Sequence, residues 1–183
     1  MHALPSTDAA ARLAGRATGA MFFFGFGGLW LEGWAQRSHA GVPWFVGIAV
    51  LAILSCAFAW RRYRRYAPAL ARQEDTPQRR RAKRVFNIVN AAQWIVILVL
   101  GNVMANLGYG AWVIPMVIVV VGLHFLPLAH VFAYWPHFAT GAAMVGFALL
   151  YPFIASGGPA SPLGFLGAGL ILWCSAAWAL RAA

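Results

Sequence analysis

Six long apolar stretches, separated by shorter polar or glycine-containing segments, dominate the hydropathy pattern of this chain. They cover about residues 17–34, 43–60, 85–106, 110–132, 138–154 and 163–180. A helix needs about 17 to 25 predominantly apolar residues to cross the hydrocarbon core of a bilayer, and each of these stretches reaches that length. The pattern therefore predicts an all-α integral membrane protein with a bundle of six transmembrane helices.

The lengths of the connecting segments predict how these helices pair. Short connections join the first stretch to the second, the third to the fourth and the fifth to the sixth, so each pair is expected to form an antiparallel hairpin. A tight turn joins the fourth stretch to the fifth, whereas residues 61–84 form a longer basic loop. We therefore expect three hairpins within a single transmembrane domain that covers residues 1–183.

The composition supports a membrane protein. Hydrophobic residues make up 62% of the chain and charged residues only 10%, whereas a soluble domain typically has about a quarter of its residues charged. A chain with so few charges cannot cover a water-exposed surface, so most of its surface is expected to face lipid.

The positions of the cationic residues predict the orientation in the membrane. Of the 14 lysine and arginine residues, all except Arg37 lie near the N-terminus, in the segment 61–84 or near the C-terminus. Cationic residues concentrate on the cytoplasmic side of membrane proteins. With six crossings, these regions share one side, so both termini and the segment 61–84 are predicted to be cytoplasmic. High alanine and arginine content with a single lysine is typical of a GC-rich bacterium, which indicates the bacterial inner membrane.

The segment 61–84 carries two basic clusters whose expected partners are lipid headgroups. Basic residues beside a spanning helix attract anionic phospholipids, and this explanation is stronger than nucleic-acid binding, which is not predicted. A homo-oligomer is left open. The residues expected to contact headgroups on the cytoplasmic side are Arg61, Arg62, Arg64, Arg65, Arg79, Arg80, Arg81, Lys83 and Arg84.

Polar side chains inside the apolar stretches are the candidate functional residues, because such groups are costly in lipid and often mark sites. Glu32 is the only acidic residue in a predicted span; it either stays hydrated near the outer headgroups or binds a proton or cation at an outer mouth. The third span carries several amides, most of them on one face, which either hydrogen-bond between helices or line a polar path. The candidates there are Asn87, Asn90, Gln93 and Asn102.

His124 is the deepest imidazole, a little inward of the middle of the fourth span. Pro127 leaves the carbonyl of the residue four positions before it without a helical donor, which adds a polar group nearby. The hairpin is expected to bring His124 level with residues 90–94, in contact with Asn90 or Gln93. His124 is then either a satisfied core histidine or a group that binds or relays a proton or hydrogen-bonds a ligand.

His130 and His137 differ from His124, because they flank the tight turn at the predicted cytoplasmic surface. They are expected to be interfacial residues with no special role.

Motifs of catalysis are missing from the sequence. There is no HExxH motif, no cluster of cysteine and histidine, no G-x-S-x-G and no P-loop. The chain has only four acidic residues, three of them outside the predicted spans. No residue set indicates an enzyme, and neither a metal nor a cofactor is predicted.

Two hypotheses for function follow, and the number of deep polar groups favours the first. The first is a transporter- or channel-like pathway for a small solute or ion, with a polar locus around His124. The second is a non-catalytic membrane protein that packs, or binds lipid or a partner through its basic loop. A cofactor-binding redox subunit is a distant third.

Overall fold

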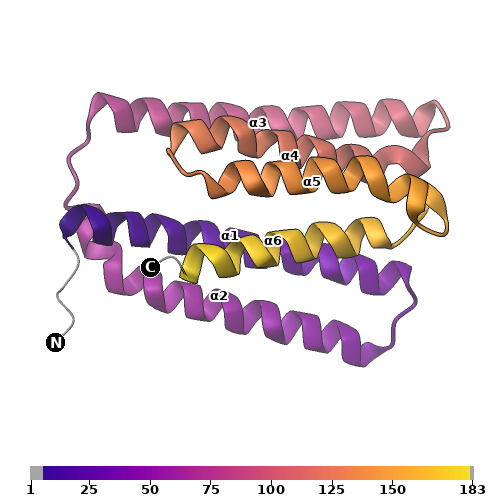
Figure 1. Cartoon of the computed structure of the whole chain (residues 1–183), viewed down its shortest axis with the longest axis horizontal. Helices are drawn as coiled ribbons and strands as arrows, with labels where there is room; N and C mark the ends of the chain where they lie inside the picture. Colours follow the sequence, from indigo (N-terminus) through magenta and orange to yellow (C-terminus); the bar gives the residue numbers. More distant parts are fainter. Residues whose placement is uncertain (1–5, 182–183) are drawn as a thin grey trace. The chain divides into compact units, whose positions relative to one another are not determined.

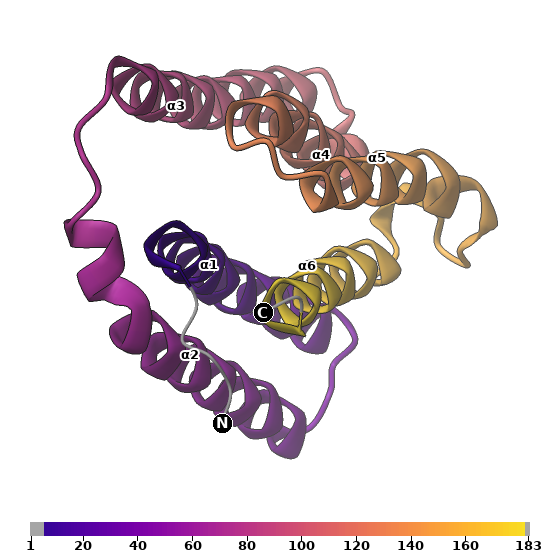
Figure 2. The same cartoon turned by 60° about the vertical axis from the view of Figure 1, so that its left-hand side comes forward.

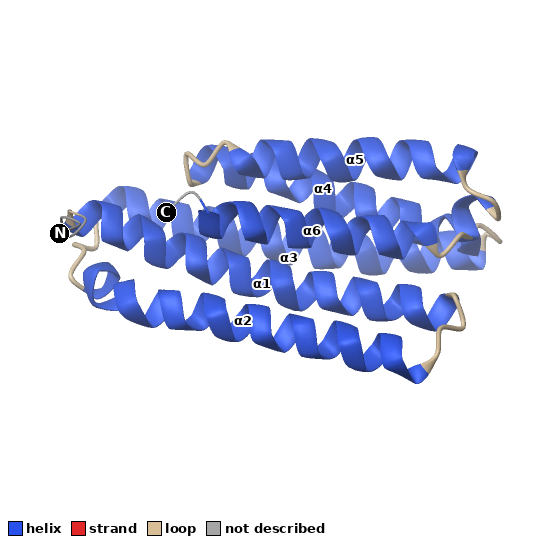
Figure 3. Cartoon of the chain, turned by 60° about the horizontal axis from the view of Figure 1, so that its bottom comes forward, coloured by secondary structure: helices blue, strands red, loops and turns tan. Residues whose placement is uncertain are grey.

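The structure, a computed structural model, describes residues 6–181 and shows them as helices and loops without a strand (Figure 3). Both predicted cytoplasmic ends, residues 1–5 and 182–183, lie outside the described residues. The predicted all-α class is confirmed. The elements are α1 (Thr7–Arg37), α2 (Val42–Ala71), α3 (Pro77–Asn106), the 3₁₀-helix η1 (Gly110–Trp112), α4 (Val113–Val131), α5 (Pro136–Ile154), the 3₁₀-helix η2 (Gly158–Ala160) and α6 (Leu163–Arg181) (Figure 1).

Five helical segments of the described chain are long and apolar enough to cross a membrane: α2, α3, Gly110–Val131, α5 and α6. The protein is therefore a multi-pass membrane protein by helix length and hydropathy. Helix α1, which contains the predicted span 17–34, is not among the five, although its 31 residues are sufficient in length. Arginines at its start, together with glycines, tryptophans and Glu32, lower its hydropathy, so a sixth span stays a prediction.

Local sequence signals explain where the helices around the basic segment begin and end. Helix α2 continues to Ala71 and α3 already begins at Pro77, so most of the segment 61–84 is helical. The side chain of Thr76 accepts a hydrogen bond from the backbone N–H of Arg79, and Pro77 occupies the first turn. This combination stabilises a helix start, because the first N–H groups have no partner within the helix.

Two compact units make up the chain, and the first contains α1, α2 and the C-terminal half of α6. Helices α1 and α2 form an antiparallel pair (Figures 1 and 2). Small side chains permit close packing in this unit, as is usual for helices in membranes. Its core consists of Ala17, Ala20, Phe24, Ala59, Ala176 and Leu180.

The second unit, Thr76–Ile171, contains α3, α4, α5 and the N-terminal half of α6. Helices α4 and α5 pack side by side (Figure 2), and their backbones approach closely at Gly122 and Gly141. A Cβ atom placed on Gly141 would lie only 2.7 Å from the carbonyl oxygen of Gly122. Because any larger side chain would collide with backbone, glycine at these positions sets the distance between the two helices.

Candidate functional site

His124 lies between α4 and α3 in the second unit. Its half-buried imidazole lies next to the backbone of Val89 on α3, close enough to interact with it. Val89 precedes Asn90, and Gln93 lies one helical turn further along α3. The sequence predicted that His124 lies level with residues 90–94 of α3. In the structure it lies beside the backbone of Val89, one residue before that range.

His137, in the first turn of α5, lies close to His124. The ring of Phe125, the neighbour of His124 in sequence, stacks on His137 with a centroid distance of 5.7 Å and an angle of 24° between the planes. The two imidazoles are near enough to interact electrostatically. The sequence interpretation gave His137 no role. The short turn between α4 and α5 was the sequence signal that could have indicated this position. Such a turn places the first residues of α5, including His137, beside the last residues of α4.

Four buried polar atoms belong to side chains of the second unit: Gln93 Oε1, His124 Nδ1, Tyr134 OH and His137 Nδ1. His124 and His137 lie near each other, and Gln93 lies one helical turn from Val89 along α3. We refer to these four residues as the polar cluster. The ring of Tyr134 meets that of His137 edge-on at 5.0 Å, while Gln93 Oε1 and His124 Nδ1 have no hydrogen-bond partner among the described residues. A buried acceptor left without a donor costs about 1–3 kcal/mol, so both atoms favour a water molecule or a polar ligand.

The other predicted pathway residues have different surroundings. Asn90 is half-buried, whereas Asn87 and Asn102 are exposed on the surface of the second unit. The amide of Asn102 donates to the carbonyl oxygen of Leu98 at 2.9 Å, on its own helix. Glu32 is half-buried on α1, in the first unit. A pathway role for these residues stays a prediction.

The predicted headgroup residues are on the surface, with one partial exception. Arg62 is half-buried, and its Nη1 donates a hydrogen bond to the carbonyl oxygen of Leu180 on α6. The exposed members are Arg61, Arg64, Arg65, Arg79, Arg80, Arg81, Lys83 and Arg84.

Among residues 6–181, no three histidine, cysteine, aspartate or glutamate side chains lie close enough together to hold a metal ion. The chain matches no protein-family model, no curated protein and no solved structure. The function is therefore inferred from the polar cluster and from the charged surfaces of the helices.

Proposed function

We propose that this multi-pass membrane protein provides a transporter- or channel-like pathway in the bacterial inner membrane, with the polar cluster as the place where a small solute or ion binds. The observation that carries the proposal is the pair of buried acceptors, Gln93 Oε1 and His124 Nδ1, which have no partner among the described residues. In this proposal α1 is a sixth crossing, and both termini and the segment 61–84 are cytoplasmic, as the positions of the cationic residues indicate.

The chemistry of the cluster favours a ligand that donates hydrogen bonds. Nδ1 of His124 has no hydrogen-bond partner among the described residues, and the backbone of Val89 lies next to the ring. In a neutral imidazole that carries its proton on Nε2, Nδ1 is an acceptor. An amide oxygen such as Gln93 Oε1 is also an acceptor. Two acceptors suit water, a proton, an ammonium-type cation or a hydroxylated solute better than an anion.

Water access to His124 tests the proposal directly. Solid-state NMR of histidine-labelled protein in lipid bilayers, with magnetisation transferred from water, reports which imidazoles lie next to water. His39, an exposed residue in the loop after α1, serves as the positive reference, and a His124→Gln variant assigns the signal. We expect the His124 signal to build up from water nearly as fast as that of His39. A His124 signal that receives no magnetisation from water would refute the pathway.

Flux through reconstituted protein tests the role of the same side chain. Proteoliposomes that contain a pH-sensitive dye report proton entry, and a panel of ammonium-type cations and small polyols extends the measurement to solutes. His124→Gln is expected to reduce the flux of the conducted species about tenfold or more, because the amide of glutamine neither takes up a proton nor reproduces the position of Nδ1. His130→Gln is the matched control, because His130 is exposed on the same helix and its Nδ1 contacts the carbonyl oxygen of Leu126 at 3.2 Å.

The second candidate function, a non-catalytic protein that binds lipid or a partner, is favoured by the helical basic segment. The end of α2 and the start of α3 expose basic side chains, which attract anionic surfaces. If the His124 signal receives no magnetisation from water and His124→Gln leaves the flux unchanged, this second function is the better description of the protein.

A further inference from the structure

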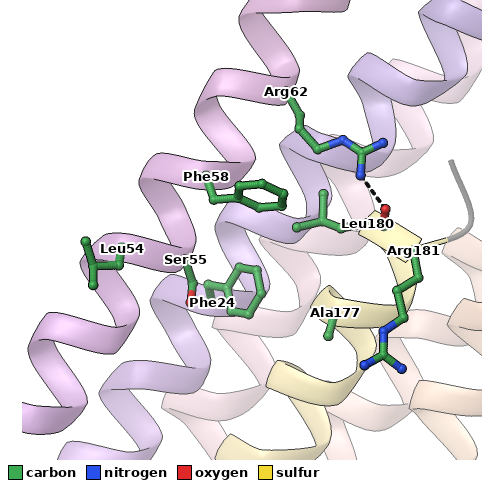
Figure 4. Close-up of a pocket in the computed structure, with 8 residues that line it drawn as sticks. All are labelled: Phe24, Leu54, Ser55, Phe58, Arg62, Ala177, Leu180 and Arg181. Carbon is green, nitrogen blue, oxygen red and sulfur yellow. Dashed lines mark hydrogen bonds between the residues drawn. The ribbon is translucent and has the colours of Figure 1, made fainter.

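A groove with a volume of about 540 Å³ lies in the first unit, and it is lined by α1, α2 and the C-terminal half of α6 (Figure 4). Its apolar wall includes Phe24 from α1 together with Leu54 and Phe58 from α2. Arg62 from α2 and Arg181 from α6 also line the groove. The guanidinium of Arg62 points toward Leu180, whereas the side chain of Arg181 extends in the opposite direction, past Ala177 (Figure 4).

The wall of the groove changes from apolar to basic along α2. Leu54, Phe58 and Arg62 follow one another at intervals of four residues, so they lie on one face of the helix. Eight residues correspond to about 12 Å along the helix axis, a length along which part of an acyl chain can lie. The apolar side chains on this face are uncovered within the unit, since Leu54 is 61% exposed and Phe58 is 54% exposed.

The basic part of the groove is partly preorganised. Arg62 donates from Nη1 to the carbonyl oxygen of Leu180, in the last turn of α6, and this bond holds its side chain across the groove (Figure 4). A guanidinium has five N–H donors, so others can still bind a second acceptor. Neither Arg62 nor Arg181 forms an ion pair with a carboxylate of the described residues, which leaves both positive charges available to an anion.

We propose that this groove is a binding site for one anionic phospholipid. Its phosphate binds Arg62 at the basic end of the groove and draws in the exposed side chain of Arg181, and one acyl chain lies over Phe58 and Leu54. Guanidinium groups match the planar donor geometry that phosphate oxygens accept, and the exposed apolar wall matches a hydrocarbon chain, which free phosphate would leave uncovered. The site differs from general attraction between a basic segment and the membrane, because it needs these two arginines and not their neighbours. It is independent of the polar cluster.

Native mass spectrometry of the whole protein in detergent tests the site, with phosphatidylglycerol as the probe and phosphatidylcholine as the neutral-headgroup comparison. We expect one phosphatidylglycerol to bind in preference to phosphatidylcholine. The double variant Arg62→Gln with Arg181→Gln is expected to weaken phosphatidylglycerol binding at least about tenfold, since hydrogen bonds to charged groups are each worth about that factor or more.

The matched control is the double variant Arg61→Gln with Arg64→Gln, which removes the same charge from exposed positions of α2 outside the groove. Binding close to wild type is expected there, and equal weakening in both double variants would overturn the proposal in favour of diffuse attraction. If inorganic phosphate displaces phosphatidylglycerol at a concentration similar to that of the lipid, the acyl chain does not contribute to binding, and that part of the proposal is overturned. A protein dimer that excludes lipid would also overturn the proposal, since a second copy would then be the occupant.

A single variant avoids the contact that Arg62 makes with α6. Arg181 is exposed at the end of α6, so Arg181→Gln is expected to keep the fold, as judged by circular dichroism. It is expected to weaken phosphatidylglycerol binding about tenfold. Unchanged affinity in a folded Arg181→Gln variant would contradict the site.

Discussion

Replacing Gly141 by alanine tests how the second unit is held together. Gly141 lies on α5 where that helix crosses α4, and an added Cβ would lie 2.7 Å from the carbonyl oxygen of Gly122, 3.2 Å from Cδ2 of Leu126 and 3.4 Å from Cβ of Phe125. The shortest of these contacts is with backbone, which cannot rotate away as a side chain can. The variant therefore has to separate the two helices or shift one along the other.

The magnitude follows from two opposing effects. Inserting a carbon atom into a tightly packed contact typically costs about 1–3 kcal/mol, whereas alanine favours a helix over glycine by about 0.5–1 kcal/mol. Gly146, on the same helix, has nothing within 4 Å of an added Cβ, so Gly146→Ala keeps the second effect without the first. The difference in unfolding free energy between the two variants is therefore expected to be about 1–3 kcal/mol, with Gly141→Ala the less stable.

The assay is reversible unfolding in mixed micelles with increasing sodium dodecyl sulfate, followed by tryptophan fluorescence and far-ultraviolet circular dichroism. Wild type, Gly141→Ala and Gly146→Ala are compared under identical conditions, so that effects of the detergent cancel. If Gly141→Ala and Gly146→Ala unfold at the same detergent fraction, the close approach of α4 and α5 is not what stabilises this unit, and the reasoning is refuted.

Three further variants can be measured by the same unfolding titration. Trp173→Phe removes the indole donor that reaches the carbonyl oxygen of Phe24 at 3.0 Å, and a loss of about 1 kcal/mol is expected; wild-type stability would mean that the indole contributes only packing. Tyr151→Phe removes a hydroxyl that donates to the carbonyl oxygen of Pro159 at 3.1 Å, again for about 1 kcal/mol, and no loss would show that this bond is not needed in lipid or detergent. Gly157 has φ of +92°, so Gly157→Ala is expected to cost about 1–2 kcal/mol, and a neutral result would contradict that backbone conformation.

Features that depend on chain length and hydropathy could be predicted from the sequence. Five spans follow from apolar runs of the right length, and the start of α3 follows from Thr76 and Pro77. The position of His124 along α3 could also be predicted from the sequence. The short connection between α3 and α4 limits how far one helix can shift along the other.

Features that depend on the rotation of a helix could not be predicted. The place of His137 beside Phe125 depends on which face α5 turns toward α4, and the contact of Gly122 with Gly141 determines that face. Hydropathy also does not show that Arg62 would be held by a residue 118 positions later. Such pairings arise from the packing of small side chains, for which a single sequence in this biased composition provides weak signals.

The bond between Arg62 and Leu180 has a consequence for the order of biogenesis. Helices α1 and α2 are synthesised first, yet the core of their unit also requires Ala176 and Leu180. All of the second unit is translated before these residues exist, so we expect the early hairpin to remain without the part of its core and groove that α6 provides. Long sequence separations of this kind slow assembly. We therefore expect the α1–α2 pair to mature last although it is made first, and ribosome-bound chains that stop before α6 to be held in an open, protease-sensitive form.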